Sequence, residues 1–567
     1  MVVTSKSEQL DSIFAELGDF GRYQVKQYAF LSLPVMFSAA FTISYVFTAG
    51  QVPHRCLVPE CGDSLNADSS NFQPPWLREA VPFEVASNAP SACLAYNHLD
   101  NATDTCNFDK SATHECSEWI FKGPENTIQS EFNLACSNDM WRLAFVGTLN
   151  NIGRLVGLPL HGYVSDRYGR KAALIFTMLG SGIFGVLRSL SWNYESFLAF
   201  EFLEAAFSGG IYAIAFILGM ELVGPSKRVL GGAVIVWAYA LGQVLYALIA
   251  WALGDWRQIL LASYSPALLF VFYIWLIPES VRWLMSHGKF RDARNVIKSA
   301  AATNRVRLSE PLLGDMEKWQ DGSKETITGE EEQGDSLWSA MCQVFTSKVL
   351  VLRLANCYLC WVTNNLVYYG LSLNAVSLAG TENQYLNFIL VSIVEAPSYI
   401  FAWQGMTRFG RRKTLCAALI ISGISCFTSP FVPEESKWIR LPLYLTGKFA
   451  ITAAFDTLYI FTAEIFPTKL RTSLLASCSM VGRLGAMLAP QTPLLAKISP
   501  YLPLEIFGAS ALISGMLALL FPETLGKSLP DSVDEAKNLK SEEAKVEKNS
   551  KRVVPKVILT TSDDDKM

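Results

Sequence analysis

Twelve apolar segments, each long enough to cross a lipid bilayer, constrain this chain more than any other feature of its sequence. A transmembrane helix needs about 20 mainly apolar residues to span the hydrocarbon core. Only 17% of the residues are charged, whereas about a quarter are charged in soluble proteins. We therefore predict an all-α polytopic membrane protein. The segments lie near residues 28–50, 142–164, 172–190, 196–221, 230–253, 256–277, 349–375, 383–405, 413–432, 439–463, 473–492 and 502–521.

The polar segment between the first two apolar segments, residues 51–141, carries half of the 12 cysteines of the chain. An even number of cysteines in one segment predicts disulfides, which form in an oxidising compartment outside the cytosol. Six cysteines allow fifteen pairings, and the sequence does not choose among them. Asn101 begins an Asn-Ala-Thr glycosylation sequon in the same segment, which we therefore predict to be extracellular. The cysteines are Cys56, Cys61, Cys93, Cys106, Cys116 and Cys136.

An extracellular loop after the first of twelve spans puts both chain ends and the central polar segment in the cytosol. Lys and Arg gather in cytoplasmic loops, and they cluster here at 167–171, 227–228, 408–413 and 469–471. We expect no cleaved signal peptide, because no short apolar core precedes the first span. The predicted domains are a cytosolic N-terminus (1–27), an N-terminal six-helix bundle with the extracellular loop (28–277), a cytosolic central loop (278–347), a C-terminal six-helix bundle (348–521) and a cytosolic tail (522–567), whose charged composition predicts disorder.

The two sets of six spans repeat one another. Three motifs of the first half return about 240 residues later, all at predicted cytosolic ends of spans. They indicate duplication of a six-helix unit. The repeat is imperfect, because Thr407 stands where the first half has Asp166. The repeated motifs are Arg167-Tyr-Gly-Arg170 with Arg408-Phe-Gly-Arg411, Glu221–Arg228 with Glu464–Arg471, and Pro278-Glu-Ser280 with Pro522-Glu-Thr524.

The loop Gly162-Tyr-Val-Ser-Asp-Arg-Tyr-Gly-Arg-Lys171 resembles the signature loop of the major facilitator superfamily. The motifs that begin at Pro278 and Pro522 look like those of its sugar-porter branch. The six-cysteine loop and the motif Gly482–Pro490 are similar to those of the organic cation, carnitine and organic anion transporters of solute carrier family 22. The resemblance covers about Phe20–Pro530. It implies two six-helix bundles that hold substrate between them near the membrane midplane.

The resemblance also implies a cytoplasmic gate. Asp166 would meet the positive end of a neighbouring helix, and Arg167 and Arg170 would pair with acids on adjacent helices. Isolated surface ion pairs contribute little stability, so their repetition in both halves favours gating, in which the network breaks and reforms as the halves rock. The predicted gate residues are Asp166, Arg167, Arg170, Glu221, Arg228, Glu279, Arg282, Arg411, Glu464, Arg471 and Glu523.

Two ionisable residues within spans are the first candidates for a substrate site, because charges inside a membrane are costly and usually functional. At about 1.5 Å per residue, Asp456 lies about 12 Å and Arg483 about 18 Å from the cytosolic ends of their helices. By resemblance, Arg483 occupies a position where anion and carnitine transporters carry arginine, and Asp456 matches an acid of the cation transporters. A site with both signs predicts a zwitterionic substrate. The alternative is that the two side chains neutralise each other.

Aromatic and polar side chains complete the predicted site. Tyr368 and Trp361 lie two turns apart on one helix face. Aromatic faces hold an ammonium group with about 0.5–2 kcal/mol, although packing is the alternative role. Tyr212, Asn151 and Glu395 match further positions of the family's cavity wall or gate.

Two charged residues depart from the family pattern: Arg154, where relatives are usually apolar, and Glu201, where an arginine is usual. Glu204 lies close to Glu201 in the same span. The helix rise leaves an Arg154–Glu204 pair within reach. Its role, in substrate binding or in stabilising the bundle, is open.

These observations predict an alternating-access transporter of small organic ions in the plasma membrane. Zwitterions such as carnitine, a betaine, a β-amino acid or an amino-acid conjugate are expected first. The alternatives are an organic anion exchanger, an organic cation facilitator and, from another class, a non-transporting membrane receptor or sensor. The expected partners are the organic substrate and the lipid bilayer, and the net charge of −4 argues against nucleic acid.

An enzyme is not expected. The 5 histidines belong to no HExxH motif, and the chain has no nucleophile elbow or phosphate loop. We expect no metal and no cofactor. Coupling to Na⁺ is an open option, because Glu464 matches an acid tied to Na⁺ use in carnitine transporters.

Overall fold

The computed structural model describes residues 6–18, 20–64, 72–83, 89–99, 106–224, 227–307, 342–378, 383–433, 436–468, 470–527, 530 and 532–539. Asn101, the predicted glycosylation site, lies outside these residues.

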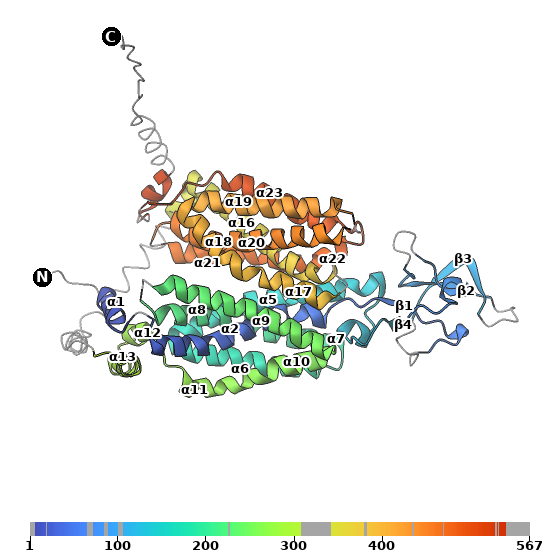
Figure 1. The fold of residues 1–567 in the computed structure, drawn as a ribbon, viewed down its shortest axis with the longest axis horizontal. Coiled ribbons are helices and arrows are strands. Elements are labelled where there is room, and N and C mark those ends of the chain that lie inside the picture. Colours follow the sequence, from blue (N-terminus) through green and yellow to red (C-terminus); the bar gives the residue numbers. More distant parts are fainter. Residues whose placement is uncertain are drawn as a thin grey trace, which may run out of the picture.

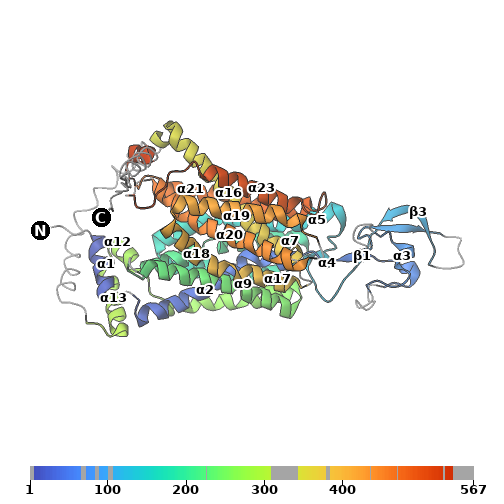
Figure 2. The ribbon, with the colours of Figure 1, turned by 45° about the horizontal axis from the view of Figure 1, so that its top comes forward.

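Two bundles of long helices lie side by side, one from each half of the chain (Figures 1 and 2). The helices of the N-terminal bundle are α2 (Arg22–Thr48), α5 (Cys136–Tyr168), α6 (Arg170–Ser189), α7 (Tyr194–Ser208) with α8 (Ile211–Glu221), α9 (Arg228–Leu253), and α10 (Trp256–Tyr264) with α11 (Tyr273–Leu276). Those of the C-terminal bundle are α16 (Lys348–Leu378), α17 (Gln384–Ile393) with α18 (Glu395–Arg408), α19 (Arg411–Thr428), α20 (Lys437–Ile465), α21 (Arg471–Leu488) with α22 (Thr492–Leu495), and α23 (Leu502–Ala518).

Eight helices or helix pairs of the described residues can cross a membrane by length and composition alone. Helices α5, α16 and α20 are longer, with 33, 31 and 29 residues, and lie within the same two bundles. The apolar segments of the sequence therefore correspond to the membrane helices.

Four of the predicted spans consist of more than one α-helix, and two of them are divided by a break of only one or two residues. The span predicted at 196–221 divides into α7 and α8 at Gly209 and Gly210, and the span predicted at 383–405 divides into α17 and α18 at Val394. Both glycines lie against α5. A Cβ on Gly210 would come within 2.4 Å of His161 Nδ1, and one on Gly209 within 3.1 Å of the Arg154 backbone. Glycine thus allows the break and the close approach of α5.

The segment 51–141 extends from one end of the bundles (Figures 1 and 2). Strands β1 (His54–Cys56) and β4 (Trp119–Phe121) pair antiparallel, as do β2 (Leu94–His98) and β3 (Phe108–Glu115). All six predicted cysteines form disulfides, which confirms that prediction. The sequence left the pairing open, and the structure shows Cys56–Cys116, Cys61–Cys106 and Cys93–Cys136.

Short helices cover the opposite end: α1 (Lys6–Glu16), α12 (Val281–Ser286) and α13 (Phe290–Asn304). Asn304 Oδ1 accepts a hydrogen bond from the Tyr23 backbone at 2.7 Å, and its Nδ2 donates to the Leu17 carbonyl at 2.9 Å. The predicted disorder of the tail is wrong for residues 533–539. They are helical and pack by Ala536 and Leu539, and Arg353 donates to the Ala536 carbonyl.

Candidate substrate site and gates

The duplicated cytosolic motifs adopt the same structure in both halves. Gly169 and Gly410 have φ of +104° and +96° and separate consecutive helices. Each glycine faces a carboxylate. Glu279 accepts the Arg170 backbone N–H at 2.9 Å, and Glu523 accepts the Arg411 backbone N–H at 2.8 Å. These carboxylates bind the positive N-terminal ends of α6 and α19.

The acid that binds the N-terminal end of α6 is therefore Glu279. The prediction that Asp166 takes such a position is wrong in this structure. The Asp166 side chain is 79% exposed and pairs with Arg170 of the adjoining helix at 3.0 Å. Burial raises the pKa of Glu279, although hydrogen bonds from backbone N–H groups favour its ionised form. Arg167 lies 5.9 Å from the Tyr163 ring centroid and reaches no acid within 4.0 Å among the described residues.

The other ion pairs of the predicted gate also repeat. Arg170 Nε lies 3.5 Å from Glu221, and Arg411 Nε lies 3.0 Å from Glu464. Thr524 Oγ1 donates to Glu464 at 2.6 Å. All these contacts join residues of the same half. Arg228 and Arg471 begin α9 and α21, and Arg282 lies in α12. The gating role of the whole set stays a prediction.

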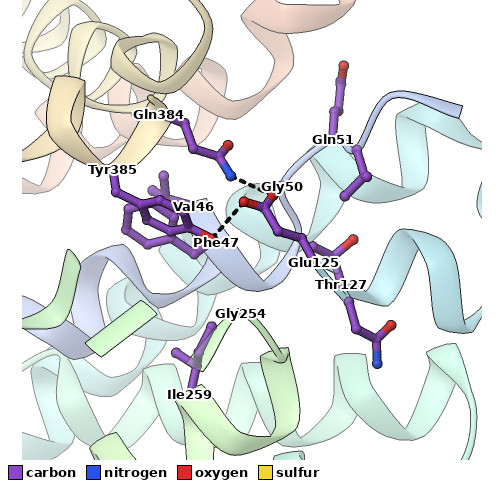
Figure 3. A pocket seen from close by; sticks show the side chains of 12 residues that line it. Val46, Phe47, Gly50, Gln51, Glu125, Thr127, Gly254, Ile259, Gln384 and Tyr385 are labelled. Carbon is purple, nitrogen blue, oxygen red and sulfur yellow. Dashed lines mark hydrogen bonds between the residues drawn. The ribbon is translucent and has the colours of Figure 1, made fainter. Parts of the chain in front are cut away.

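The two halves contact each other at the opposite, extracellular end. Glu125, just before α4 (Ile128–Glu131), accepts hydrogen bonds from Gln384 Nε2 at 2.7 Å and Tyr385 Oη at 3.1 Å (Figure 3). Thr148 Oγ1 donates to the Met487 carbonyl at 2.9 Å. Phe47 packs edge-on against Phe388, with centroids 5.2 Å apart. Contacts between the halves at the outer end are those expected of an inward-facing state.

The segment that carries Glu125 is anchored to the N-terminal half. Asn126 Nδ2 donates to Asp255 at 2.9 Å, and the Trp256 backbone N–H donates to the Asn126 carbonyl at 3.0 Å. Glu131 accepts a hydrogen bond from Trp256 Nε1 at 2.6 Å. Glu125 therefore bridges from a fixed position in one half to α17 of the other.

A buried ion pair lies at the interface of the two halves. Lys448 Nζ contacts Glu395 at 2.9 Å, with side chains 0% and 5% exposed. Tyr368 donates to the same carboxylate at 2.9 Å, and its ring centroid lies 3.4 Å from Lys448 Nζ. Gln243 of α9 donates to it at 3.1 Å, across the interface. Glu395 and Tyr368 were predicted for the site. Lys448 was missed, although a lysine within an apolar segment is itself a signal.

Asp456 and Arg483 are both partly exposed, and no salt bridge of 4.0 Å or less joins them in the described part of the chain. Asp456 Oδ2 has no hydrogen-bond partner among the described residues. Asp456 interacts electrostatically with Tyr212 of the other half and with Glu395, and Arg483 interacts with Tyr459. Asp456 therefore lies near the other half, and Arg483 lies on α21, whose Met487 contacts Thr148 of the other half; no salt bridge neutralises the two directly.

The remaining predicted residues divide into exposed and buried ones. Tyr212 is partly exposed and stacks edge-on with Tyr239, at a centroid distance of 5.4 Å. Trp361 is 1% exposed, and its indole N–H donates to Thr462 at 3.1 Å. Asn151 is 3% exposed and donates to the Gly147 carbonyl at 2.9 Å. Trp361 and Asn151 thus support the wall of the interface from behind.

The departures from the family pattern meet in the N-terminal bundle. Arg188 pairs with Glu201 and lies 4.0 Å from Glu204. Arg154 Nε donates instead to Asn150 at 2.9 Å. The Arg154–Glu204 salt bridge considered from the sequence is therefore not formed, because Arg188 of α6 holds that position. Its location inside the apolar segment 172–190 was the available signal.

The model of the protein family described as "Sugar (and other) transporter" matches residues 95–533 of the chain. The chain is 32% identical over 531 residues to an organic cation transporter protein of Drosophila melanogaster, covering 93% of this chain and 94% of the relative. It is 30% identical over 546 residues to organic cation/carnitine transporter 2 of Homo sapiens, with 94% of each chain covered. It is also 30% identical over 558 residues to solute carrier family 22 member 6-A of Xenopus laevis, covering 94% of this chain and 96% of the relative. The chain belongs to solute carrier family 22 of the major facilitator superfamily. This family 22 protein is therefore a multi-pass membrane transporter and not an enzyme.

Solved structures show the same fold. The family 22 chain superposes on the proton:xylose symporter XylE with a TM-score of 0.54 at 17% identity, covering 92% of this chain and 100% of the symporter. An inward-open form of XylE from E. coli gives a TM-score of 0.56 at 16% identity, with 91% and 99% covered.

Proposed function

We propose that this transporter carries small zwitterionic organic ions across the plasma membrane by alternating access, with both chain ends in the cytosol. The observation that carries the proposal is that Asp456, within electrostatic range of Tyr212 of the other half, and Arg483 on α21 are partly exposed and not paired with each other.

The charges around Asp456 favour an ammonium group there. Lys448 already neutralises Glu395, so Asp456 is left as the acid with an unpartnered oxygen. Tyr212 lies within electrostatic range of Asp456, and Tyr368 is partly exposed nearby on the Glu395 carboxylate. Aromatic faces beside a carboxylate suit an organic cation.

Arg483 supplies the opposite charge on α21. A guanidinium presents two parallel donors to a carboxylate, so it binds the anionic end of a zwitterion and repels a simple cation. Two of the relatives are named organic cation transporter and organic cation/carnitine transporter, which agrees with such a substrate. Carnitine itself carries both charges. We do not include coupling to Na⁺ through Glu464 in the proposal, because Arg411 and Thr524 already bind this carboxylate.

The test is uptake of four labelled compounds into oocytes: carnitine, β-alanine, tetraethylammonium and p-aminohippurate. Wild type is compared with Asp456→Asn and Arg483→Ala, and Glu195→Gln on the exposed surface serves as a control. We expect zwitterion uptake that both site variants lose. Uptake of p-aminohippurate that survives Asp456→Asn would instead identify an organic anion carrier. Cation uptake that survives Arg483→Ala would identify an organic cation facilitator.

A further inference from the structure

Five ionisable side chains gather inside the N-terminal bundle, away from the proposed substrate site. Each is 4% exposed or less, and they come from α5, α6 and α7. We call this group the N-half polar cluster. It consists of Arg154, His161, Arg188, Glu201 and Glu204.

One of the two acids in the N-half polar cluster is fully partnered. Arg188 pairs directly with Glu201, and Asn150 Nδ2 donates to the other oxygen of that carboxylate at 2.7 Å. Arg188 also donates to Ser44 Oγ and to Tyr264 Oη, both at 3.1 Å. The charge and most of the donors of Arg188 are therefore already engaged.

Glu204, one turn further along α7, is different. Neither of its carboxylate oxygens has a hydrogen-bond partner among the described residues, and Arg188 Nη1 lies 4.0 Å away. Ser208 Oγ, on the next turn, has no partner there either. Burying an ionised carboxylate without hydrogen bonds is costly, whereas a carboxyl group that carries a proton is buried at much lower cost.

Groups from every neighbouring helix face Glu204. Arg154 of α5 and Arg188 of α6 are cations, and Glu201 lies on its own helix. Tyr264 of α10 and Tyr246 of α9 also interact electrostatically with Glu204. The two arginines of the cluster repel a metal cation, and its two glutamates repel an anion. A proton on the Glu204 carboxylate is therefore the ligand that fits these charges.

His161, the fifth member of the N-half polar cluster, packs against the break between α7 and α8. His161 is 3% exposed, and neither ring nitrogen has a hydrogen-bond partner within the described ranges. It packs directly on Gly210, where the helix breaks between α7 and α8. Histidine gains and loses a proton near neutral pH when its surroundings permit.

The helix break connects this group to the substrate site. Tyr212, the second residue of α8, lies just beyond Gly210, and it is within electrostatic range of Asp456 in the other half. We propose that Glu204 binds a proton from one side of the membrane and releases it to the other during transport. Substrate movement is then proton-coupled. This inference rests on the proposed transport function.

The first readout needs no substrate. Infrared difference spectra of the purified full chain, recorded for pH steps, report the carbonyl stretch of a protonated carboxylic acid. We expect such a band in the wild type, its loss in Glu204→Gln and its retention in Glu195→Gln, which alters an exposed acid of the same helix. A band unchanged in Glu204→Gln would overturn the assignment to Glu204.

The second readout uses proteoliposomes and labelled carnitine. An inward proton gradient is expected to accelerate wild-type uptake several-fold, with alkalinisation outside, while Glu204→Gln keeps exchange of internal for external carnitine but loses the response to the gradient. A wild type that transports carnitine without responding to the gradient would overturn proton coupling, even if Glu204→Gln does not fold. If the wild type transports no compound of the four-compound panel, the proposed function fails, and the infrared band still decides whether Glu204 binds a proton.

Discussion

Replacing Lys448 by methionine should destabilise the protein far more than the loss of one contact suggests. Lys448 and Glu395 lie 2.9 Å apart and are almost fully buried. At an effective dielectric constant of about 20, two charges at this distance attract by about 6 kcal/mol before desolvation is subtracted. Lys448→Met leaves the Glu395 charge buried, with Tyr368 and Gln243 as its remaining donors. Breaking such a pair from one side costs about 3–5 kcal/mol.

The double variant Lys448→Met/Glu395→Gln removes both charges together. Replacing a whole buried pair is often nearly neutral, because the desolvation cost disappears with the attraction. We therefore expect the double variant to be more stable than Lys448→Met alone, with a coupling energy of at least about 2 kcal/mol. The matched control is Lys537→Met, whose exposed pair with Asp534 at 3.2 Å should contribute about 0–1 kcal/mol.

The assay is thermal and denaturant unfolding of the purified full chain in detergent, followed by tryptophan fluorescence. The expected order of stability places the wild type and Lys537→Met first, the double variant next and Lys448→Met last. Glu395→Gln alone completes the double-mutant cycle. If the effects of Lys448→Met and Glu395→Gln add up to the effect of the double variant, Lys448 and Glu395 do not interact as described.

Two further predictions concern the gates. Glu125→Ala removes two hydrogen bonds between the halves at the extracellular end, each worth about 1.5–3 kcal/mol because the acceptor is charged. A cysteine introduced at Leu143, which lines a cavity of about 130 Å³ near that end, should then be labelled faster from the extracellular side, and an unchanged rate would argue that these bonds do not hold the end closed. Gly169→Ala places a methyl group 2.1 Å from Glu279 in a backbone conformation with φ of +104°, so transport should fall sharply. The control Gly162→Ala, whose methyl group meets nothing within 4 Å, should leave transport unchanged, and equal activity of the two variants would show that the turn at Gly169 does not require glycine.

Much of the fold follows from the sequence because hydrophobic length, charge asymmetry and internal repetition are local properties. The apolar segments predict the helices, and the duplicated motifs predict the matching turns at Gly169 and Gly410. The disulfide pairing does not follow from the sequence, because it depends on which of the four short strands pair with each other. The breaks at Gly210 and Val394 depend on packing between helices, which hydropathy does not report.

The sequence predicts several residues of the candidate site but not which side chains pair with each other. Depth along a helix identified Asp456 and Arg483, because helix rise is constant. Partners depend also on the rotation of each helix about its axis. Arg188 therefore takes the position beside Glu204 that the sequence left to Arg154, and Lys448 binds Glu395.

The most direct test of the central claim, a single site with both charges, is ligand-induced thermal stabilisation of the purified protein. A ligand that binds the folded state raises the melting temperature with its concentration. Carnitine, which carries both charges, should stabilise the wild type, whereas tetraethylammonium and p-aminohippurate, with one charge each, should stabilise it less. We predict that Asp456→Asn and Arg483→Gln each lose the response to carnitine, because each substitution removes the partner of one end of the substrate. An undiminished response to carnitine in either variant would contradict a site in which the two residues bind opposite ends of one substrate.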